Sequence, residues 1–227
     1  MTRQTQLTEQ DRDRIAQAVS RAEAESAGEV VTIVSDRSDT YADIALIWSA
    51  LAAFVALIVF ALKAPFYLGL WDWLTNDWAN EWNAQALFAV AALVAMVKFL
   101  GVWLFLLWRP LRLWLTPRPI RHHRVRDRAN MLFKAAAEKR TTGRTGILIY
   151  LSLEEHRAEI VADEAIAARV DPSVWGDALA PLLAHLREGR MAEGLVEAVS
   201  RVGKVLATHL PVSPGDVNEL PDRVIEV

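Results

Sequence analysis

The sequence contains no cysteine, which excludes disulfide bonds, thiolate metal sites and cysteine nucleophiles. It also lacks a glycine-rich phosphate loop, a G-x-S-x-G nucleophile motif and an H-E-x-x-H zinc motif. There are five histidines among 227 residues, and only His122 and His123 are neighbours. On a helix these two side chains diverge by about 100°, so we predict that they are solvated or at a lipid interface rather than metal ligands.

Charge is divided unevenly along the chain, although the net charge is only −3. Residues 109–144 carry eleven Arg/Lys against two Asp/Glu, whereas residues 1–43 carry five against nine and residues 163–227 carry six against eleven. A basic band of this kind binds either nucleic-acid phosphates or anionic lipid. Because its polar part has no aromatic platform and its flanks are acidic, we expect no nucleic-acid partner and favour the lipid bilayer.

Two long apolar runs predict a pair of transmembrane helices. Residues 44–62 contain no charge and only Ser49 as a polar group, and about 19 helical residues match the thickness of the hydrocarbon core. Residues 84–108 are apolar apart from Gln85 and Lys98. A lysine near the bilayer centre costs roughly 2.5–3.5 kcal/mol, which the apolar neighbours offset. We expect Lys98 either to reach the nearer head groups or to contact a partner helix or a lipid phosphate.

The segment between the two runs is rich in tryptophan and poor in basic residues. It holds Trp71, Trp73, Trp78 and Trp82, a pattern typical of an interfacial aromatic belt on a short surface helix. Arginines follow the second run at once, and the positive-inside rule therefore places that end, and with it residues 1–43, in the cytoplasm. The residues expected at the lipid interface are Arg109, Arg112, Arg118, Arg121, Trp71 and Trp73.

The segments on either side of this hairpin predict two parts of one α/β domain. Thr8 and Asp11 form a capping-box pattern at the start of a helix, and residues 29–36 form a short β-branched strand. After the hairpin come a helix over 120–140, a strand over 145–153, an alternating partner strand over 156–163, and helices from Asp171-Pro172 and from Met191. Because a helix and strand of about 40 residues bury no core alone, we expect one small mixed sheet flanked by helices.

The predicted organisation has seven segments. The α/β domain occupies residues 1–43 and 120–210, and the transmembrane helices occupy 44–62 and 84–108. A Trp-rich turn at 63–83, a basic juxtamembrane segment at 109–119 and a tail at 211–227 complete the chain. The end of the tail, Val224 to Val227, is expected either to add an edge strand to this domain or to dock on a partner.

Two blocks of sequence carry a family resemblance: "SAGEVVTIVSDRSDTYAD" and "RTGILIYLSLEEHRAEIVADEAIAARVDPSVWGDALAPLLAHLREGRMAEGLVEAV". Their order of helix, strand, interrupted region, strand hairpin and helical end resembles the TPM domain family, and bacterial membrane-bound members are the most similar. The resemblance implies a TPM-like fold. Known members include thylakoid-lumen proteins of photosystem repair and an accessory subunit of an animal neurotransmitter receptor, and some have been assigned acid phosphatase activity or calcium binding.

The chain departs from the common TPM plan in two respects. Many TPM domains face outward or into a lumen and carry one C-terminal anchor, whereas here two predicted spans interrupt the domain. The small Gly-Tyr-Gly-like loop after the third strand is replaced by Val161–Glu164. Both departures weaken the transfer of phosphatase function to this chain.

Acidic residues after the first and third predicted strands form the best candidate site for chemistry. Asp36, Asp39 and Asp43 follow the first strand, and Asp163 and Glu164 follow the third. If the carboxyl ends of these strands lie together, the carboxylates would form a Ca²⁺ or Mg²⁺ site able to assist phosphate-ester hydrolysis. The same residue types also suit turns and helix caps, so both interpretations stay open.

The function expected from these patterns is that of an integral protein of a bacterial inner (plasma) membrane with both termini in the cytoplasm. Its TPM-like domain is expected to be a non-enzymatic interaction or accessory module for another membrane protein or complex. The alternative is a membrane-bound, metal-assisted phosphatase that uses the acidic loops.

Overall fold

The computed structural model describes residues 7–75, 82–136, 145–212 and 220–227. The chain divides into two compact units. One unit comprises Met1–Asp39 together with Arg118–Val227, and the other comprises Thr40–Pro117.

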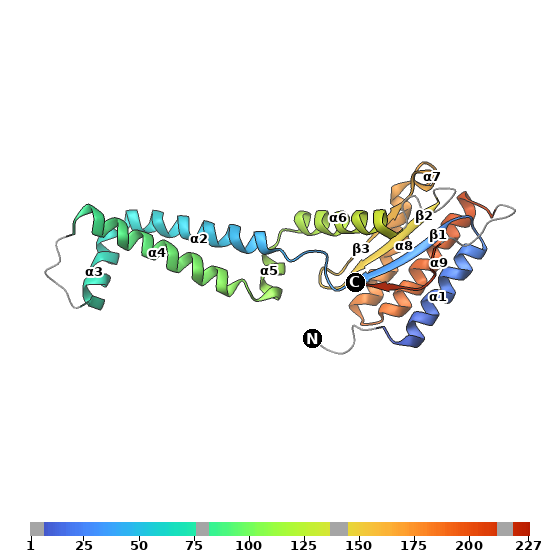
Figure 1. Ribbon diagram of the computed structural model, residues 1–227, viewed down its shortest axis with the longest axis horizontal. Helices are drawn as coiled ribbons and strands as arrows, with labels where there is room; N and C mark the ends of the chain where they lie inside the picture. Colours follow the sequence, from blue (N-terminus) through green and yellow to red (C-terminus); the bar gives the residue numbers. More distant parts are fainter. Residues whose placement is uncertain (1–6, 76–81, 137–144, 213–219) are drawn as a thin grey trace. The chain divides into compact units, whose positions relative to one another are not determined.

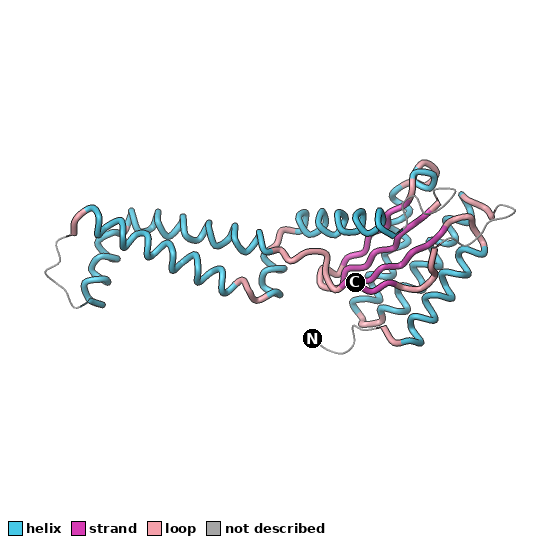
Figure 2. The backbone as a smooth tube through the Cα atoms, viewed as in Figure 1, coloured by secondary structure: helices cyan, strands magenta, loops and turns pink. Residues whose placement is uncertain are grey.

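The first unit is built on a four-stranded mixed sheet with the order β3-β2-β1-β4 (Figures 1 and 2). β1 (Glu29–Ser35) and β2 (Gly146–Ser152) pair in parallel over their whole lengths. β3 (Arg157–Ala162) runs antiparallel to β2, and β4 (Ile225–Glu226) extends β1 in parallel. The whole second unit therefore lies within the connection between two adjacent parallel strands.

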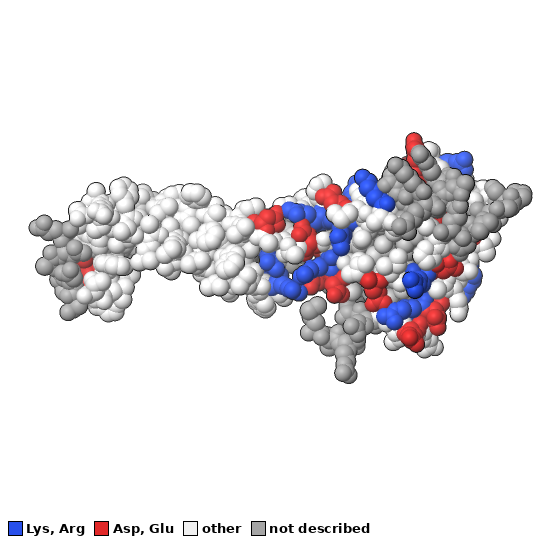
Figure 3. Space-filling view, viewed as in Figure 1, with Lys and Arg blue, Asp and Glu red and all other residues white. Residues whose placement is uncertain are grey.

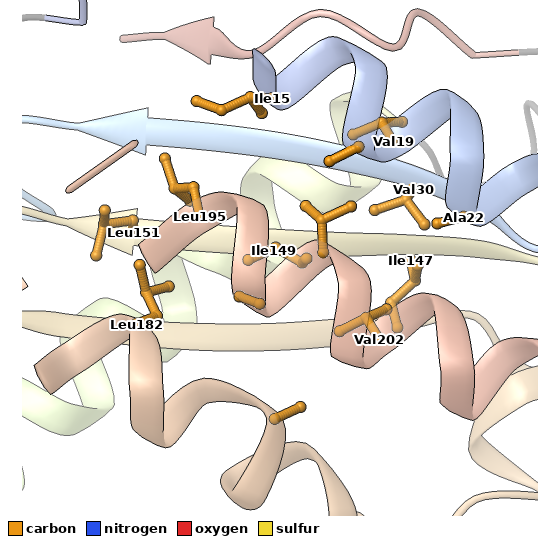
Figure 4. Close-up of a cluster of buried hydrophobic side chains, with 14 of the residues drawn as sticks. Ile15, Val19, Ala22, Val30, Ile147, Ile149, Leu151, Leu182, Leu195 and Val202 are labelled. Carbon is orange, nitrogen blue, oxygen red and sulfur yellow. The ribbon is translucent and has the colours of Figure 1, made fainter. Parts of the chain in front are cut away.

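Helices cover both faces of this sheet. α1 (Glu9–Ala24), α8 (Pro172–Arg187) and α9 (Met191–His209) pack on one face, and Figure 4 shows the side chains that meet there. α6 (Arg118–Ala136) covers the other face, where its Val125, Ala129 and Phe133 pack on residues of β1 and β2. Every residue of β1 and of β2 is buried, as expected for strands covered on both faces.

Local sequence signals set the ends of the helices. The backbone N–H of Asp11 donates to Thr8 Oγ1 at 3.1 Å and the N–H of Thr8 donates to Asp11 Oδ2 at 3.2 Å, which confirms the predicted capping box. α8 begins at Pro172, and Asp171 Oδ1 accepts the Ser173 N–H at 2.8 Å. Asp171 is therefore a helix cap.

α1 and α9 approach each other closely at Gly203. A Cβ atom added to Gly203 would lie 2.6 Å from the Cβ of Ala22. The predicted buried face of α1 (Ile15, Ala18, Val19 and Ala22) is buried in the structure. Glycine at position 203 thus lets the backbones of two helices that cover the sheet come together.

The second unit contains α2 (Ala42–Leu62), α3 (Ala64–Thr75), α4 (Ala84–Phe105) and α5 (Arg109–Leu115). α2 and α4 pack side by side in opposite directions (Figure 1). α2 buries mainly small residues and one aromatic ring, including Ala45, Ser49, Ala56 and Phe60. The Ser49 hydroxyl donates to the Ala45 carbonyl at 2.7 Å, so this polar group is satisfied within the helix.

Both long helices of the second unit are long and apolar enough to span a membrane. Only 28% of the most apolar stretch of α2, and 6% of that of α4, is buried within the structure. The large side chains that project outward include Ile47, Phe54, Ile58, Phe88, Met96 and Val97. In Figure 3 most of the visible surface along these two helices is white, the colour of residues other than Lys, Arg, Asp and Glu.

The predicted fold class, a small mixed sheet flanked by helices, is confirmed. α6 begins at Arg118 rather than Ile120, because Pro119 fits the first turn of a helix. The predicted end of this helix at Arg140 lies outside the described residues. β4 adds an edge strand to the chain's own sheet, which is the first of the two alternatives for the tail.

Candidate functional site

The carboxyl ends of β1 and β2 hold a group of hydrogen-bonded polar side chains. The Ser38 N–H donates to Glu155 Oε1 at 3.0 Å, and the hydroxyls of Ser38 and Tyr150 lie 3.0 Å apart. The Ser152 hydroxyl donates to the other oxygen of Glu155. Ser152, Glu155 and Tyr150 are all buried. This network fastens the chain after β1 to the turn between β2 and β3.

An ion pair joins the same loop to α6. Arg124 Nη1 contacts Asp39 Oδ2, although 85 positions separate the two residues in the sequence. Asp36 is exposed, and its backbone carbonyl accepts the Glu154 N–H at 2.9 Å. Asp39, the last residue before the second unit, is thus bonded to α6, the first helix after that unit.

A second polar group lies between α6 and the edge strand β3. His122 Nδ1 lies 3.2 Å from Glu159 Oε1 and 3.3 Å from Arg157 Nη1. Burial raises the pKa of Glu159 above its ordinary value. Nearby positive charges offset part of that rise, and they belong to His122, Arg126 and Arg157. The other member of the adjacent pair, His123, lies 3.3 Å from Asp127 on its own helix.

The acids predicted to share one metal site lie at opposite ends of the sheet. Asp36 and Asp39 follow the carboxyl end of β1. Asp163 accepts the Gly146 N–H at 3.3 Å, at the amino end of β2, and Glu164 follows it. A six-residue strand spans about 20 Å, so the two pairs do not meet.

The direction of β3 explains this separation. β3 begins with Arg157 opposite Ser152 and ends with Ala162 opposite Ile147. Its carboxyl end therefore returns to the edge where β1 and β2 begin, and the premise that the loops after β1 and β3 lie together is wrong. In the described segments no group of three or more His, Asp or Glu side chains is arranged to hold a metal.

The residues predicted to lie at the lipid interface belong to three helices. Trp71 and Trp73 are on α3, where Trp71 is half-buried and Trp73 is exposed. Arg109 and Arg112 are on α5, and Arg118 and Arg121 are on α6. Trp78 lies outside the described residues. Contact of these side chains with lipid stays a prediction.

Several residues that tie the polar network together were not expected from the sequence. They are Ser38, Arg124, Tyr150, Ser152 and Glu155. One local signal was available, because Ser152 and Glu155 have the S-x-x-E spacing of a capping box, in which the carboxylate returns to the residue three positions earlier. The bonds of Ser38 and Arg124 join segments far apart in the sequence, and no local pattern marks them.

Comparison with known proteins adds evidence on the identity of the first unit. A family model described as TPM domain matches residues 115–205. The chain contains a TPM domain. The match runs from the end of α5 into α9, and the first unit adds α1, β1 and β4 to the matched residues. The whole first unit is called the TPM domain from here on.

One solved structure supports the fold of the TPM domain. It is the NMR structure of BA42 protein from the psychrophilic bacterium Bizionia argentinensis, with a TM-score of 0.56 and 16% sequence identity. The similarity covers 100% of this chain and 99% of BA42. No curated protein matches the chain. At this identity the likeness to BA42 concerns the fold alone.

Proposed function

We propose that the chain is an integral protein of a bacterial inner membrane whose TPM domain acts in the cytoplasm as an accessory module for another membrane protein or complex. α2 and α4 form the transmembrane hairpin, α3 lies at the outer interface, and the arginines of α5 and the start of α6 contact lipid head groups.

The observation that carries this proposal is the apolar outer surface of α2 and α4. A core helix of a soluble protein buries most of its apolar residues, whereas these two helices leave most of theirs uncovered. Burial of apolar surface is worth about 25 cal/mol per Å², so this surface strongly favours transfer into the hydrocarbon core. The hairpin is thus suited to a bilayer.

The orientation rests on the distribution of basic residues. Between α2 and α4 the sequence has Lys63 as its single basic residue, whereas seven arginines occupy residues 109–128. Basic residues close to a span are retained on the cytoplasmic side. Two spans then bring the parts of the TPM domain before and after the hairpin to that same side.

The accessory role rests on how the polar groups of the TPM domain are used. Ser38, Tyr150, Ser152 and Glu155 are bonded to one another, and Asp39 is paired with Arg124. Side chains engaged in this way hold loops in place. Because their donors and acceptors are occupied, they support a binding scaffold better than a catalytic centre.

Membrane insertion and orientation have a direct test. The full chain should stay with the membrane after alkaline carbonate extraction. Two reporters are fused after Val227, one that works only in the cytoplasm and one that works only in the periplasm, and only the first should be active. Release by carbonate would contradict insertion, and activity of a reporter that requires the periplasm would contradict the orientation.

The accessory role is tested against the phosphatase alternative. The purified full chain should turn over no phosphate ester across pH and with Ca²⁺ or Mg²⁺, and native gels of mildly solubilised membranes should show it in a larger assembly. Turnover that is lost on Asp36→Asn or Asp163→Asn would replace the accessory role by the phosphatase alternative.

A further inference from the structure

Lys98 is a charged side chain on the outer surface of the hairpin. It lies on α4 and is exposed, and no hydrogen bond or ion pair joins it to any other residue in the described part of the chain. α4 is otherwise apolar from Ala86 to Phe105. In the membrane proposed above, its ammonium group needs a partner from outside this chain.

The position of Lys98 along α4 disfavours escape to the head groups. Lys98 is seven residues before Phe105, the last residue of α4, which is about 10 Å of helix. Side chains on a helix lean toward its amino end, and for Lys98 that direction leads into the hydrocarbon core. The side chain of Lys98 therefore leaves the helix in the direction away from the nearer interface.

Three small residues lie near Lys98 on its side of α4. They are Ala91 and Ala95, seven and three residues before it, and Gly101, three residues after it. A Cβ atom added to Gly101 would meet nothing within 4 Å. Small residues let the backbone of a second helix approach closely, so a partner helix could reach the ammonium group here.

Among the residues that the structure describes, neither this chain nor a second copy supplies the partner. The end of α4 and the start of α2 lie at the same end of the hairpin, so the residue of α2 at the depth of Lys98 is near Ser49. The Ser49 hydroxyl is already bonded to the Ala45 carbonyl. The single carboxylate of α2, Asp43, is in its first turn. A symmetric pairing of two α4 helices would bring the Lys98 side chains against each other, which repels.

We propose that the Lys98 face of α4 is a docking surface for a transmembrane helix of a different protein that carries an Asp or Glu at the same depth. This inference rests on the proposed membrane function and names the chemistry of the partner. The ion pair lowers the cost of an unpaired lysine in hydrocarbon, and the small residues beside it let the partner helix approach.

The test measures association inside a bilayer. The full chain with a donor dye is reconstituted in phosphatidylcholine vesicles together with leucine-rich helical peptides of about 20 residues that carry an acceptor dye. One peptide has a Glu at the depth of Lys98 and its matched control has Gln there. Energy transfer should show roughly ten-fold stronger association of the Glu peptide. Lys98→Met should remove this preference, and Lys98→Glu should transfer it to a peptide with Lys.

A second variant tests the face rather than the charge. The double substitution Met96→Lys with Lys98→Met keeps one lysine on α4 but moves it about 200° around the helix. This variant should lose the preference for the Glu peptide. If it keeps the preference, any lysine exposed to lipid suffices and the assigned face is wrong.

The remaining outcomes separate this inference from the proposal on which it rests. Quenching of tryptophan fluorescence by brominated lipid in the same vesicles reports insertion of the hairpin. No quenching would contradict the membrane function itself. Quenching together with equal association of the Glu and Gln peptides would overturn only the docking surface, and a Lys98-dependent preference for phosphatidylglycerol would then assign the lysine to lipid phosphate.

Discussion

The carboxyl group of Glu23 shows how one half-buried acid makes the stability of the TPM domain depend on pH. Its Oε1 accepts the Val30 N–H at 2.8 Å where α1 approaches the start of β1. The pKa of Glu23 is raised to about 8, chiefly by burial and further by the nearby charges of Glu29 and Asp222, although the hydrogen bond from Val30 lowers it. The folded domain therefore holds a proton on Glu23 at pH values where the unfolded chain has released it.

Replacing Glu23 by glutamine should flatten the dependence of stability on pH. An acid whose folded pKa lies above its unfolded pKa, here 4.5 raised to about 8, stabilises the fold at low pH, and this contribution falls as pH rises between those two values. We expect the melting temperature of the full chain in detergent, followed by circular dichroism, to fall from pH 5 to pH 8. In the Glu23→Gln variant the melting temperature should fall much less over the same pH range. An identical pH profile in the variant would show that Glu23 does not keep its proton.

The hydrogen bond between Ser38 and Tyr150 should contribute measurably to stability. Tyr150→Phe removes a buried hydroxyl that lies 3.0 Å from the Ser38 hydroxyl, and such bonds are worth about 1 kcal/mol. A double-mutant cycle with Ser38→Ala, measured by thermal unfolding, isolates the interaction. Additive effects of the two substitutions would mean that the hydroxyls do not interact.

At the scale of helices and strands, the local signals in the sequence account for much of the fold. The Thr8 capping box, the Asp171-Pro172 start of α8 and the buried runs of β1 and β2 all mark elements that the structure contains. These features depend on neighbours within a few residues, and for that reason one sequence suffices to find them.

The candidate site was harder to predict than the helices and strands, because it depends on the order and direction of the strands in the sheet. The hairpin between β2 and β3 was expected, and an antiparallel partner necessarily returns to the edge from which β2 started. Applied to Asp163, this rule separates it from Asp36 once β1 is known to run parallel to β2. The pairing of Asp39 with Arg124 has no such local rule, since it needs the packing of α6 on the sheet.

The close packing of α1 against α9 should make position 203 intolerant of a side chain. Gly203→Ala would place its Cβ 2.6 Å from that of Ala22, and overpacking of this kind costs about 1–3 kcal/mol. The matched control is Gly176→Ala on α8, where an added Cβ meets nothing within 4 Å. This control should be neutral or stabilising by about 1 kcal/mol because alanine favours helix. Equal melting temperatures for the two variants would contradict the tight packing.

At the scale of the whole molecule, the TPM domain should fold without the hairpin. Asp39 is bonded to Arg124, and Arg118 is six residues before Arg124, about 9 Å along α6. A Gly/Ser linker of about six residues covers roughly 13 Å, so it should replace Thr40–Pro117. The shortened protein should be soluble and give a cooperative thermal transition.

A matched deletion tests whether this result depends on the sheet. Extending the deletion to residues 29–117 also removes β1, which lies between β2 and β4. This version should aggregate or stay unfolded because the sheet loses a central strand and both of its neighbours lose their partner. Precipitation of the first version, with β1 intact, would show that the domain needs the hairpin in order to fold.

The parallel pairing of β1 with β2 has a consequence for synthesis of the protein in the cell. About 110 residues separate the end of β1 from the start of β2, which is roughly 5–20 s of translation at ~5–20 residues per second. Throughout that interval β1 is an unpaired apolar strand, the kind of segment that aggregates. We therefore expect a chaperone or the ribosome surface to shield it until α2 and α4 have left the ribosome. Closure of the sheet then occurs only after the whole second unit has been synthesised, so a folded TPM domain shows that α2 and α4 have already been made.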